Sequence, residues 1–199
     1  MEETKTKLNF TEIIINNREY IYPAIFYFGG LVMGSFCYKV INNTAINKLI
    51  ELIFNSSQTA FTAVFLNRFS LYFSVFVVCV FLGMCLIGFP LINAVPLLMG
   101  IEISIKIAFY YIKFGVKGIG FSMLMIIPEG AAIATVLIYT IKTSTELSKS
   151  IYQIAAKGEM SSIDIKYYVK NFVLYGLIVA LIALINAVIS FFLSAIIKL

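Results

Sequence analysis

Five long apolar stretches divide this sequence, and they constrain the fold more than any other feature. They cover residues 21–40, 69–87, 91–112, 119–141 and 172–197. A helix rises about 1.5 Å per residue, so about 20 apolar residues span the roughly 30 Å hydrocarbon core of a bilayer. In lipid the backbone must satisfy its own hydrogen bonds, which favours helices. The sequence therefore predicts an all-α fold, a polytopic membrane helical bundle with about five transmembrane helices.

The composition agrees with this class. Apolar and aromatic residues make up 61% of the chain and charged residues 13%, against about 45–50% and about 25% in soluble domains. The 199 residues suffice for a single integral membrane domain, residues 1–199, and leave no room for a separate catalytic module. The net charge of +5 suits the lipid bilayer as a partner, whereas no basic cluster interleaved with aromatic residues indicates nucleic-acid binding.

Enzyme chemistry has little support in the residue types. The chain has no histidine, which removes the commonest general base and the commonest zinc ligand. Its cysteines, Cys37, Cys79 and Cys85, lie inside apolar stretches, as small core side chains do. We therefore predict a protein that is not an enzyme, with no catalytic residue, no cofactor and no metal site.

The connecting segments contain two amphipathic patterns. In residues 44–58 and 143–157, apolar side chains recur at helical spacing opposite polar ones, which predicts short amphipathic helices at the membrane interface. The junction Gly88-Phe89-Pro90 between the second and third stretches is short and apolar. A tight hairpin and a re-entrant turn are the two alternatives for this junction.

Small residues mark candidate faces for close helix packing. Gly30 and Gly34 form a G-x-x-x-G pattern in the first stretch, Gly100 lies in the third, and Gly176 begins a row of small residues in the fifth. Such residues let helix backbones approach closely. The contact formed by Gly30 and Gly34 lies either within this bundle or between two copies in a homo-oligomer.

The distribution of Lys and Arg predicts the orientation. With five crossings, the N-terminus and residues 142–171 share one side, which is the richer in these residues. The opposite side carries Lys39, Lys48, Arg68, Lys113, Lys117 and Lys198. By the positive-inside rule we expect a multi-pass protein of the cell membrane with its N-terminus in the cytoplasm.

Away from their ends, the apolar stretches contain three charged residues, each of which alone costs about 2.5–3.5 kcal/mol on insertion scales. Glu102 and Lys106 are four residues apart and therefore share one helix face. Glu129 follows Pro128, which frees a backbone carbonyl one turn earlier. Antiparallel packing of the third and fourth stretches would bring Glu129 near Lys106. One lysine against two acids leaves a carboxylate unbalanced, which predicts that one acid is protonated.

Three interpretations of these charges stay open. They form an internal polar clip that fixes helix register, a docking feature for a partner's membrane helix, or an ion or proton path. A proton path would need more polar lining than the nearby serine, threonine and asparagine side chains provide.

Several short motifs follow one another along the chain. They are Phe65-Leu-Asn-Arg-Phe69, Leu86-Ile-Gly-Phe-Pro-Leu91, Leu97-Leu-Met-Gly100, Gly115-x-x-Gly118, and Ile126-Ile-Pro128 with the apolar residues up to Ile141. In their order and spacing the chain resembles the stage II sporulation protein M family of integral membrane proteins, over most of its length. The total length and the five-span layout also agree with this family.

The chain departs from the family pattern around Pro128. Distant relatives often have Pro-His-Gly where this chain has Pro128-Glu-Gly130, with an acid at the position of Ile133, and many sporulation members have an amide after the proline. The position is polar across the family while its chemistry varies. This variation weakens a proton path that depends on Glu129.

The resemblance implies a non-enzymatic role in engulfment during endospore formation. The family's sporulation member looks like the membrane anchor of a complex with two cell-wall hydrolases, the stage II sporulation proteins D and P, which remodel peptidoglycan. The expected function is therefore a membrane scaffold for these hydrolases. The alternative is a permease-like subunit that moves a small solute or ion through a polar site around Glu102, Lys106 and Glu129.

Overall fold

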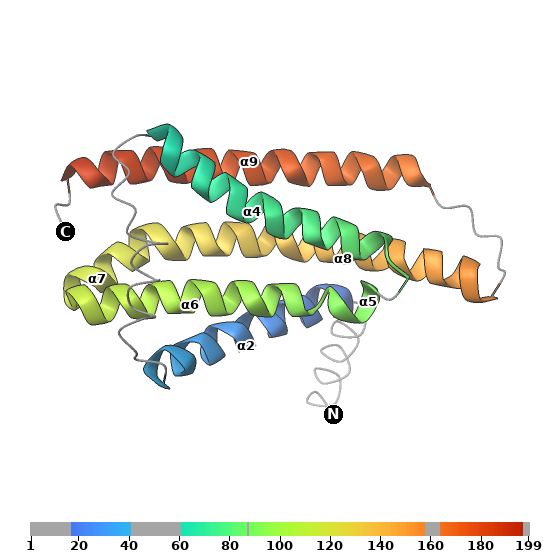
Figure 1. The fold of residues 1–199 in the computed structure, drawn as a ribbon, viewed down its shortest axis with the longest axis horizontal. Coiled ribbons are helices and arrows are strands. Elements are labelled where there is room, and N and C mark those ends of the chain that lie inside the picture. Colours follow the sequence, from blue (N-terminus) through green and yellow to red (C-terminus); the bar gives the residue numbers. More distant parts are fainter. Residues whose placement is uncertain (1–16, 41–60, 87, 158–163, 197–199) are drawn as a thin grey trace, which may run out of the picture.

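The computed structural model describes residues 17–40, 61–86, 88–157 and 164–196, and all regular elements in these ranges are helices (Figure 1). The long helices are α2 (Arg18–Val40), α4 (Phe61–Met84), α6 (Ala94–Phe114), α8 (Ile127–Lys157) and α9 (Ile165–Ile196). Three short elements join them, namely α5 (Gly88–Leu91), α7 (Val116–Phe121) and the π-helical turn η1 (Ser122–Ile126). The predicted all-α helical bundle is confirmed.

Five helical segments are long and apolar enough to cross a membrane. They are Arg18–Lys39, Val64–Met84, Gly88–Phe114, Val116–Ala155 and Ile165–Phe192. Each overlaps one of the five apolar stretches of the sequence, and this is the architecture of a multi-pass membrane protein. The predicted amphipathic segment 44–58 lies outside the described residues.

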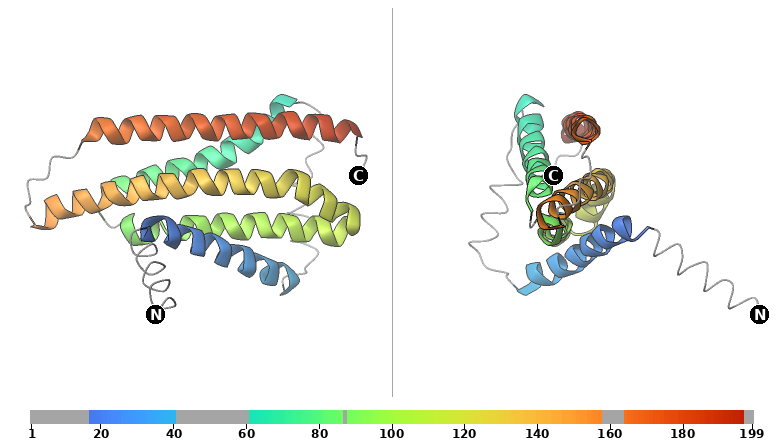
Figure 2. Two further views of the ribbon diagram at one scale, coloured as in Figure 1. Left: turned by 180° about the vertical axis from the view of Figure 1, so that it is seen from behind. Right: turned by 90° about the vertical axis from the view of Figure 1, so that its right-hand side faces the viewer.

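Helix α8 lies at the centre of the bundle and contacts α2, α4, α6 and α9. Helix α2 packs mainly on α6, whereas α4 packs between α8 and α9. Helices α9 and α2 form opposite edges of the bundle, as Figure 1 and the two further views in Figure 2 show. The largest buried apolar cluster draws on all five long helices and includes Tyr27, Phe76, Cys79, Met99, Ile133, Ile141 and Val179.

Successive long helices run in opposite directions, so the bundle has two ends (Figure 1). We call N-side the end that holds the start of α2, the α4–α5 turn, the end of α8 and the start of α9. The far side holds the end of α2, the start of α4, the α6–α7 turn and the end of α9. Between α4 and α6, the single helical turn α5 makes the reversal at the N-side, and both flanking segments are long enough to cross a membrane, as the hairpin alternative requires.

Helix α8 differs from the expectation for residues 143–157. It continues to Lys157 over 31 residues without a break, a length of about 46 Å that exceeds the hydrocarbon core. The predicted separate interfacial helix is therefore the last half of α8. The reason is packing, because the hydroxyl side chains of Thr143, Ser144, Thr145 and Ser148 are buried inside the bundle. Ser148 donates a hydrogen bond to the carbonyl of Cys85 at 2.8 Å, and Ser144 lies against Gly83.

Two helix starts also lie earlier than the apolar stretches indicate. Helix α9 begins at Ile165, where the Asp164 carboxylate caps it by accepting a hydrogen bond from the backbone N–H of Tyr167 at 3.1 Å. Helix α4 begins at Phe61, so Arg68 lies two turns inside a helix rather than in a loop. This second difference determines the composition of the polar site described next.

Candidate functional site

Glu129 on α8 faces α4, where two side chains hold its carboxylate. Arg68 Nη1 lies 3.5 Å from Glu129 Oε1, and the Tyr72 hydroxyl donates a hydrogen bond to the same oxygen. Arg68 and Tyr72 are four residues apart and therefore share one face of α4. The Glu129 side chain is 7% exposed, so this contact is closed inside the bundle.

Glu102 and Lys106 form an ion pair along one face of α6, as their spacing predicts. The Lys106 side chain is 4% exposed and that of Glu102 is 22% exposed. A buried ammonium group of this kind needs a countercharge, because an isolated charge in a low-dielectric interior is costly. Glu102 provides that countercharge within one helical turn.

The two ion pairs belong to one group of side chains. Besides Glu102, both Arg68 and Glu129 lie close enough to Lys106 to interact with it electrostatically. We call Arg68, Tyr72, Glu102, Lys106 and Glu129 the intramembrane cluster. It joins α4, α6 and α8, and its two positive and two negative charges balance.

Glu129 lies close enough to Lys106 to interact with it, as expected, but two features of the cluster differ from the sequence analysis. Glu129 pairs with Arg68 rather than directly with Lys106, because α4 packs against α8 at this level while α6 packs mainly on α2. The expected unbalanced carboxylate also disappears, since Arg68 is the second cation. Sequence reasoning missed Arg68 and Tyr72. The signal was present in their spacing of four residues and in the uneven charge count.

Pro128 shapes the backbone just before Glu129. The π-helical turn η1 ends at Ile126, and the N–H of Ile127 bonds to the carbonyl of Ser122, five residues earlier. Such a wider turn accommodates Pro128, which has no backbone N–H to donate to a helical hydrogen bond. Turns of this π-helical kind often occur at functional sites. On the other side of Glu129, the Tyr27 hydroxyl donates to the Gly130 carbonyl at 3.3 Å. The chain around Glu129 is thus fixed from α2 as well as from α4.

Two buried polar groups near this region have no hydrogen-bond partner among the described residues. They are the Glu102 carboxylate oxygen Oε2 and the Ser122 hydroxyl. Ser122 is 2% exposed, and an unsatisfied buried polar group costs about 1–3 kcal/mol. A bound proton, ion or water would stabilise either of these two groups.

The glycine pattern of α2 forms a contact within the chain. A Cβ at Gly30 would collide with the carbonyl oxygen of Leu97, and one at Gly34 would lie 2.7 Å from the carbonyl oxygen of Ile101. On α6, Gly100 approaches the backbone of α2 in the same way. Gly176 instead meets the ring of Phe76 at 3.5 Å, an ordinary contact. The α2–α6 contact therefore depends on three of the four candidate glycines.

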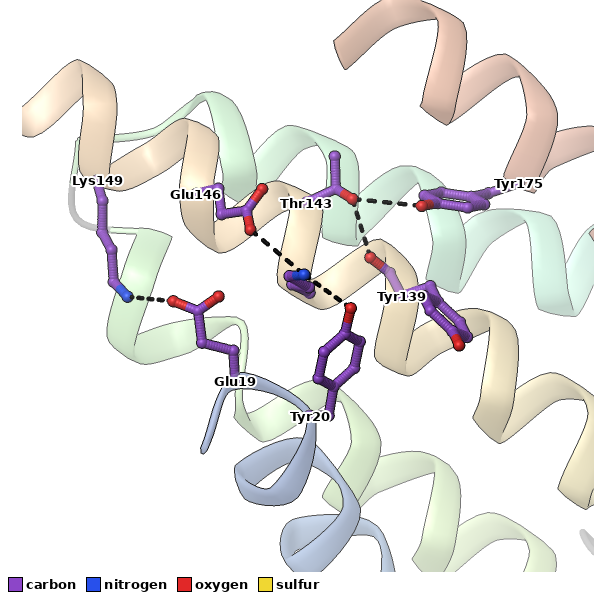
Figure 3. Close-up of polar contacts among 8 residues, drawn as sticks. Glu19, Tyr20, Tyr139, Thr143, Glu146, Lys149 and Tyr175 are labelled. Atoms are coloured by element: carbon purple, nitrogen blue, oxygen red, sulfur yellow. Dashed lines mark hydrogen bonds and ion pairs between the residues drawn. The ribbon is translucent and has the colours of Figure 1, made fainter. Parts of the chain in front are cut away.

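A second polar group, which the sequence did not indicate, holds the start of α2 against α8 at the N-side (Figure 3). Lys149 Nζ lies 3.2 Å from Glu19 Oε1, and Lys142 donates to the Tyr20 hydroxyl at 2.7 Å. Glu146 lies 3.8 Å from Lys142. We call these five residues the N-side clasp.

The described ranges contain no group of three or more His, Cys, Asp or Glu side chains placed to hold a metal ion. No protein-family model matches the chain, and no curated protein or solved structure matches it. The motifs of the sequence and the geometry of the intramembrane cluster are therefore the features that bear on function.

Proposed function

We propose that this chain is a non-catalytic membrane scaffold for peptidoglycan-remodelling hydrolases during engulfment in endospore formation. Its proposed partners are the stage II sporulation proteins D and P. The identity of the partners comes from the resemblance of the motifs between Phe65 and Ile141 to the stage II sporulation protein M family. The geometry supports the part of the proposal that concerns a non-catalytic body.

The observation that carries the proposal is the internal neutralisation of the intramembrane cluster. Glu129 and Lys106 are 7% and 4% exposed, and each has its countercharge inside the same chain. This arrangement favours the internal clip over a docking feature for a partner's membrane helix, because little of the charge is left to contact a partner. Three helices joined in this way form a body of fixed register, as a scaffold requires.

We also propose that the N-side faces the cytoplasm. Arg68 lies inside the bundle and no longer counts among the loop cations of the far side. The excess of Lys and Arg on the N-side is therefore larger than the sequence alone indicated, and the positive-inside rule applies more strongly.

The test is a pull-down of the tagged full-length chain in mild detergent from sporulating cells. We expect both hydrolases to be recovered, and a tagged multi-pass protein of unrelated function serves as the control. Recovery of a folded chain without either hydrolase, or equal recovery with the control, would contradict the proposal.

A permease-like subunit is the second candidate, and one specific observation favours it. The Glu102 Oε2 and Ser122 Oγ atoms are each buried and lack a described hydrogen-bond partner, and each would be stabilised by a small cation or a proton. The discriminating measurement is ion flux in proteoliposomes. A flux that disappears in Glu102→Gln while recovery of the hydrolases persists would favour the permease over the scaffold.

A further inference from the structure

The acidic side chains at the N-side are already occupied. Glu19 pairs with Lys149, and Glu146 pairs with Lys142 (Figure 3). The remaining described acid at this end, Asp164, caps α9. These contacts leave the other cations of the N-side without an acid of their own in the described part of the chain.

The cations in question are Arg18 at the start of α2 and Lys166 and Lys170 at the start of α9, and all three are exposed. No contact among the described residues explains the two lysines. The N-terminal end of a helix carries positive partial charge, which disfavours a cation in the first turn of α9, where Lys166 lies. Lys166 and Lys170 are also four residues apart, so they repel each other on one helix face. An anion outside the chain would account for their position.

The depth of these residues relative to the apolar stretch of α9 indicates which anion this is. The apolar stretch of α9 begins at Phe172, so Lys170 and Lys166 lie about 3 and about 9 Å beyond it along the helix axis. The headgroup layer occupies about 5–8 Å on each side of the hydrocarbon core. The cationic tips therefore reach the depth of lipid phosphates.

Contacts of the clasp region place Arg18, at the start of α2, near the level of Phe172 and so at the edge of the apolar stretch, from where its long side chain can extend outward to the headgroups. Thr143 on α8 lies 3.5 Å from the Tyr175 hydroxyl on α9, and one residue earlier Lys142 contacts Tyr20 on α2 (Figure 3). Tyr20 and Tyr175 thus meet neighbouring residues of α8. Tyr167, next to Lys166, is 52% exposed, and tyrosine is enriched at the membrane interface.

We propose that Arg18, Lys166, Lys170 and Tyr167, which we call the N-side rim, bind the phosphate groups of anionic phospholipids in the leaflet on that side. The chain then prefers an anionic to a zwitterionic membrane, and this preference depends on the residues of the N-side rim. Each cation near an anionic surface contributes about fivefold in affinity. The inference needs only the multi-pass architecture and is independent of the hydrolases.

The experiment uses the full-length chain in mild detergent, with its thermal unfolding midpoint followed during titration with phosphatidylglycerol or phosphatidylcholine. A lipid that binds the folded chain raises the midpoint. We expect phosphatidylglycerol to give the larger rise. In the variant Arg18→Gln/Lys166→Gln/Lys170→Gln the phosphatidylglycerol affinity should fall by roughly a hundredfold.

Two control variants and a titration with inorganic phosphate make the outcome decisive. The far-side variant Lys39→Gln/Lys113→Gln/Lys117→Gln removes the same number of cations and should keep the lipid response. The Lys166→Arg/Lys170→Arg variant keeps the charges and should bind as the unchanged protein does. Equal losses in the rim and far-side variants, no preference for phosphatidylglycerol, or the same rise with inorganic phosphate would each overturn the proposal.

Discussion

Arg68 on α4 and Glu129 on α8 form an ion pair across two helices, with 3.5 Å between Nη1 and Oε1. Tyr72, one turn after Arg68, donates to the same carboxylate oxygen. This relationship explains how an acid is tolerated inside the apolar stretch 119–141. The carboxylate is stabilised by a cation and a hydroxyl that come from a different part of the chain.

The pair should behave as a buried ion pair when one partner is removed. Arg68→Met leaves Glu129 without its cation, and Glu129→Leu leaves Arg68 without its anion. We expect each single variant to lose about 3–5 kcal/mol of stability. The double variant should recover most of that loss, since an apolar pair is often as stable as a buried ion pair. Thermal or denaturant unfolding in detergent measures the stability of the two single variants and of the double variant.

Arg18→Met is the matched control, because Arg18 is exposed and has no described ion pair. It should change stability by less than about 0.5 kcal/mol. Additive losses in the double variant would mean that Arg68 and Glu129 do not interact in the folded protein.

Adjacent glycines on α2 provide a second test. At Gly30 an added Cβ meets the backbone of α6, whereas at Gly29 nothing lies within 4 Å. Gly30→Ala should therefore destabilise the protein by about 1–3 kcal/mol through overpacking. Gly29→Ala should be neutral or stabilise by up to about 1 kcal/mol, since alanine favours the helix. Similar effects of both changes on the unfolding midpoint would contradict the α2–α6 contact.

The position of residues 143–157 can be tested at two serines on α8. Ser148 is fully buried and donates to the Cys85 carbonyl, so Ser148→Ala should cost about 1–2 kcal/mol. Among the described residues, Ser150 bonds only within its own helix, to the Glu146 carbonyl. Ser150→Ala should change stability by less than about 0.5 kcal/mol. If the two variants unfold at the same midpoint, this segment does not pack against the α4–α5 turn.

The proposed orientation, with the N-side in the cytoplasm, predicts which end is open to reagents outside the cell. In a chain whose native cysteines are replaced by alanine, Val116→Cys marks the far side and Tyr152→Cys marks the N-side. Val116 is 85% exposed and Tyr152 is 50% exposed. A membrane-impermeant maleimide should label only the cysteine at position 116 in intact cells. Labelling of position 152 alone would reverse the orientation.

The helical class and the Glu102–Lys106 pair follow from local patterns in the sequence. Both depend on residues close together in the chain, namely a run of apolar residues and a spacing of four. The Arg68–Glu129 pair does not follow from a local pattern, because the two residues are 61 positions apart in the chain. Which helices pack side by side depends on complementary shapes such as Gly30 against Leu97, and a single sequence does not specify these.

The boundaries of the helices also depended on tertiary contacts. Helix α4 begins at Phe61, although the apolar stretch that predicted it begins at Phe69. Arg68 is tolerated inside the helix because Glu129 neutralises it. In the same way, the polar face of α8 beyond Ile141 indicated an interfacial helix, since burial of serine side chains against α4 is not visible in a hydropathy pattern.

Our central claim is that the intramembrane charges are a structural clip within a scaffold. The most direct test is the recovery of the stage II sporulation proteins D and P from sporulating cells with the Arg68→Met/Glu129→Leu variant. If the claim holds, the folded double variant recovers both hydrolases as efficiently as the unchanged chain. A double variant that is folded and inserted but recovers neither hydrolase would contradict it.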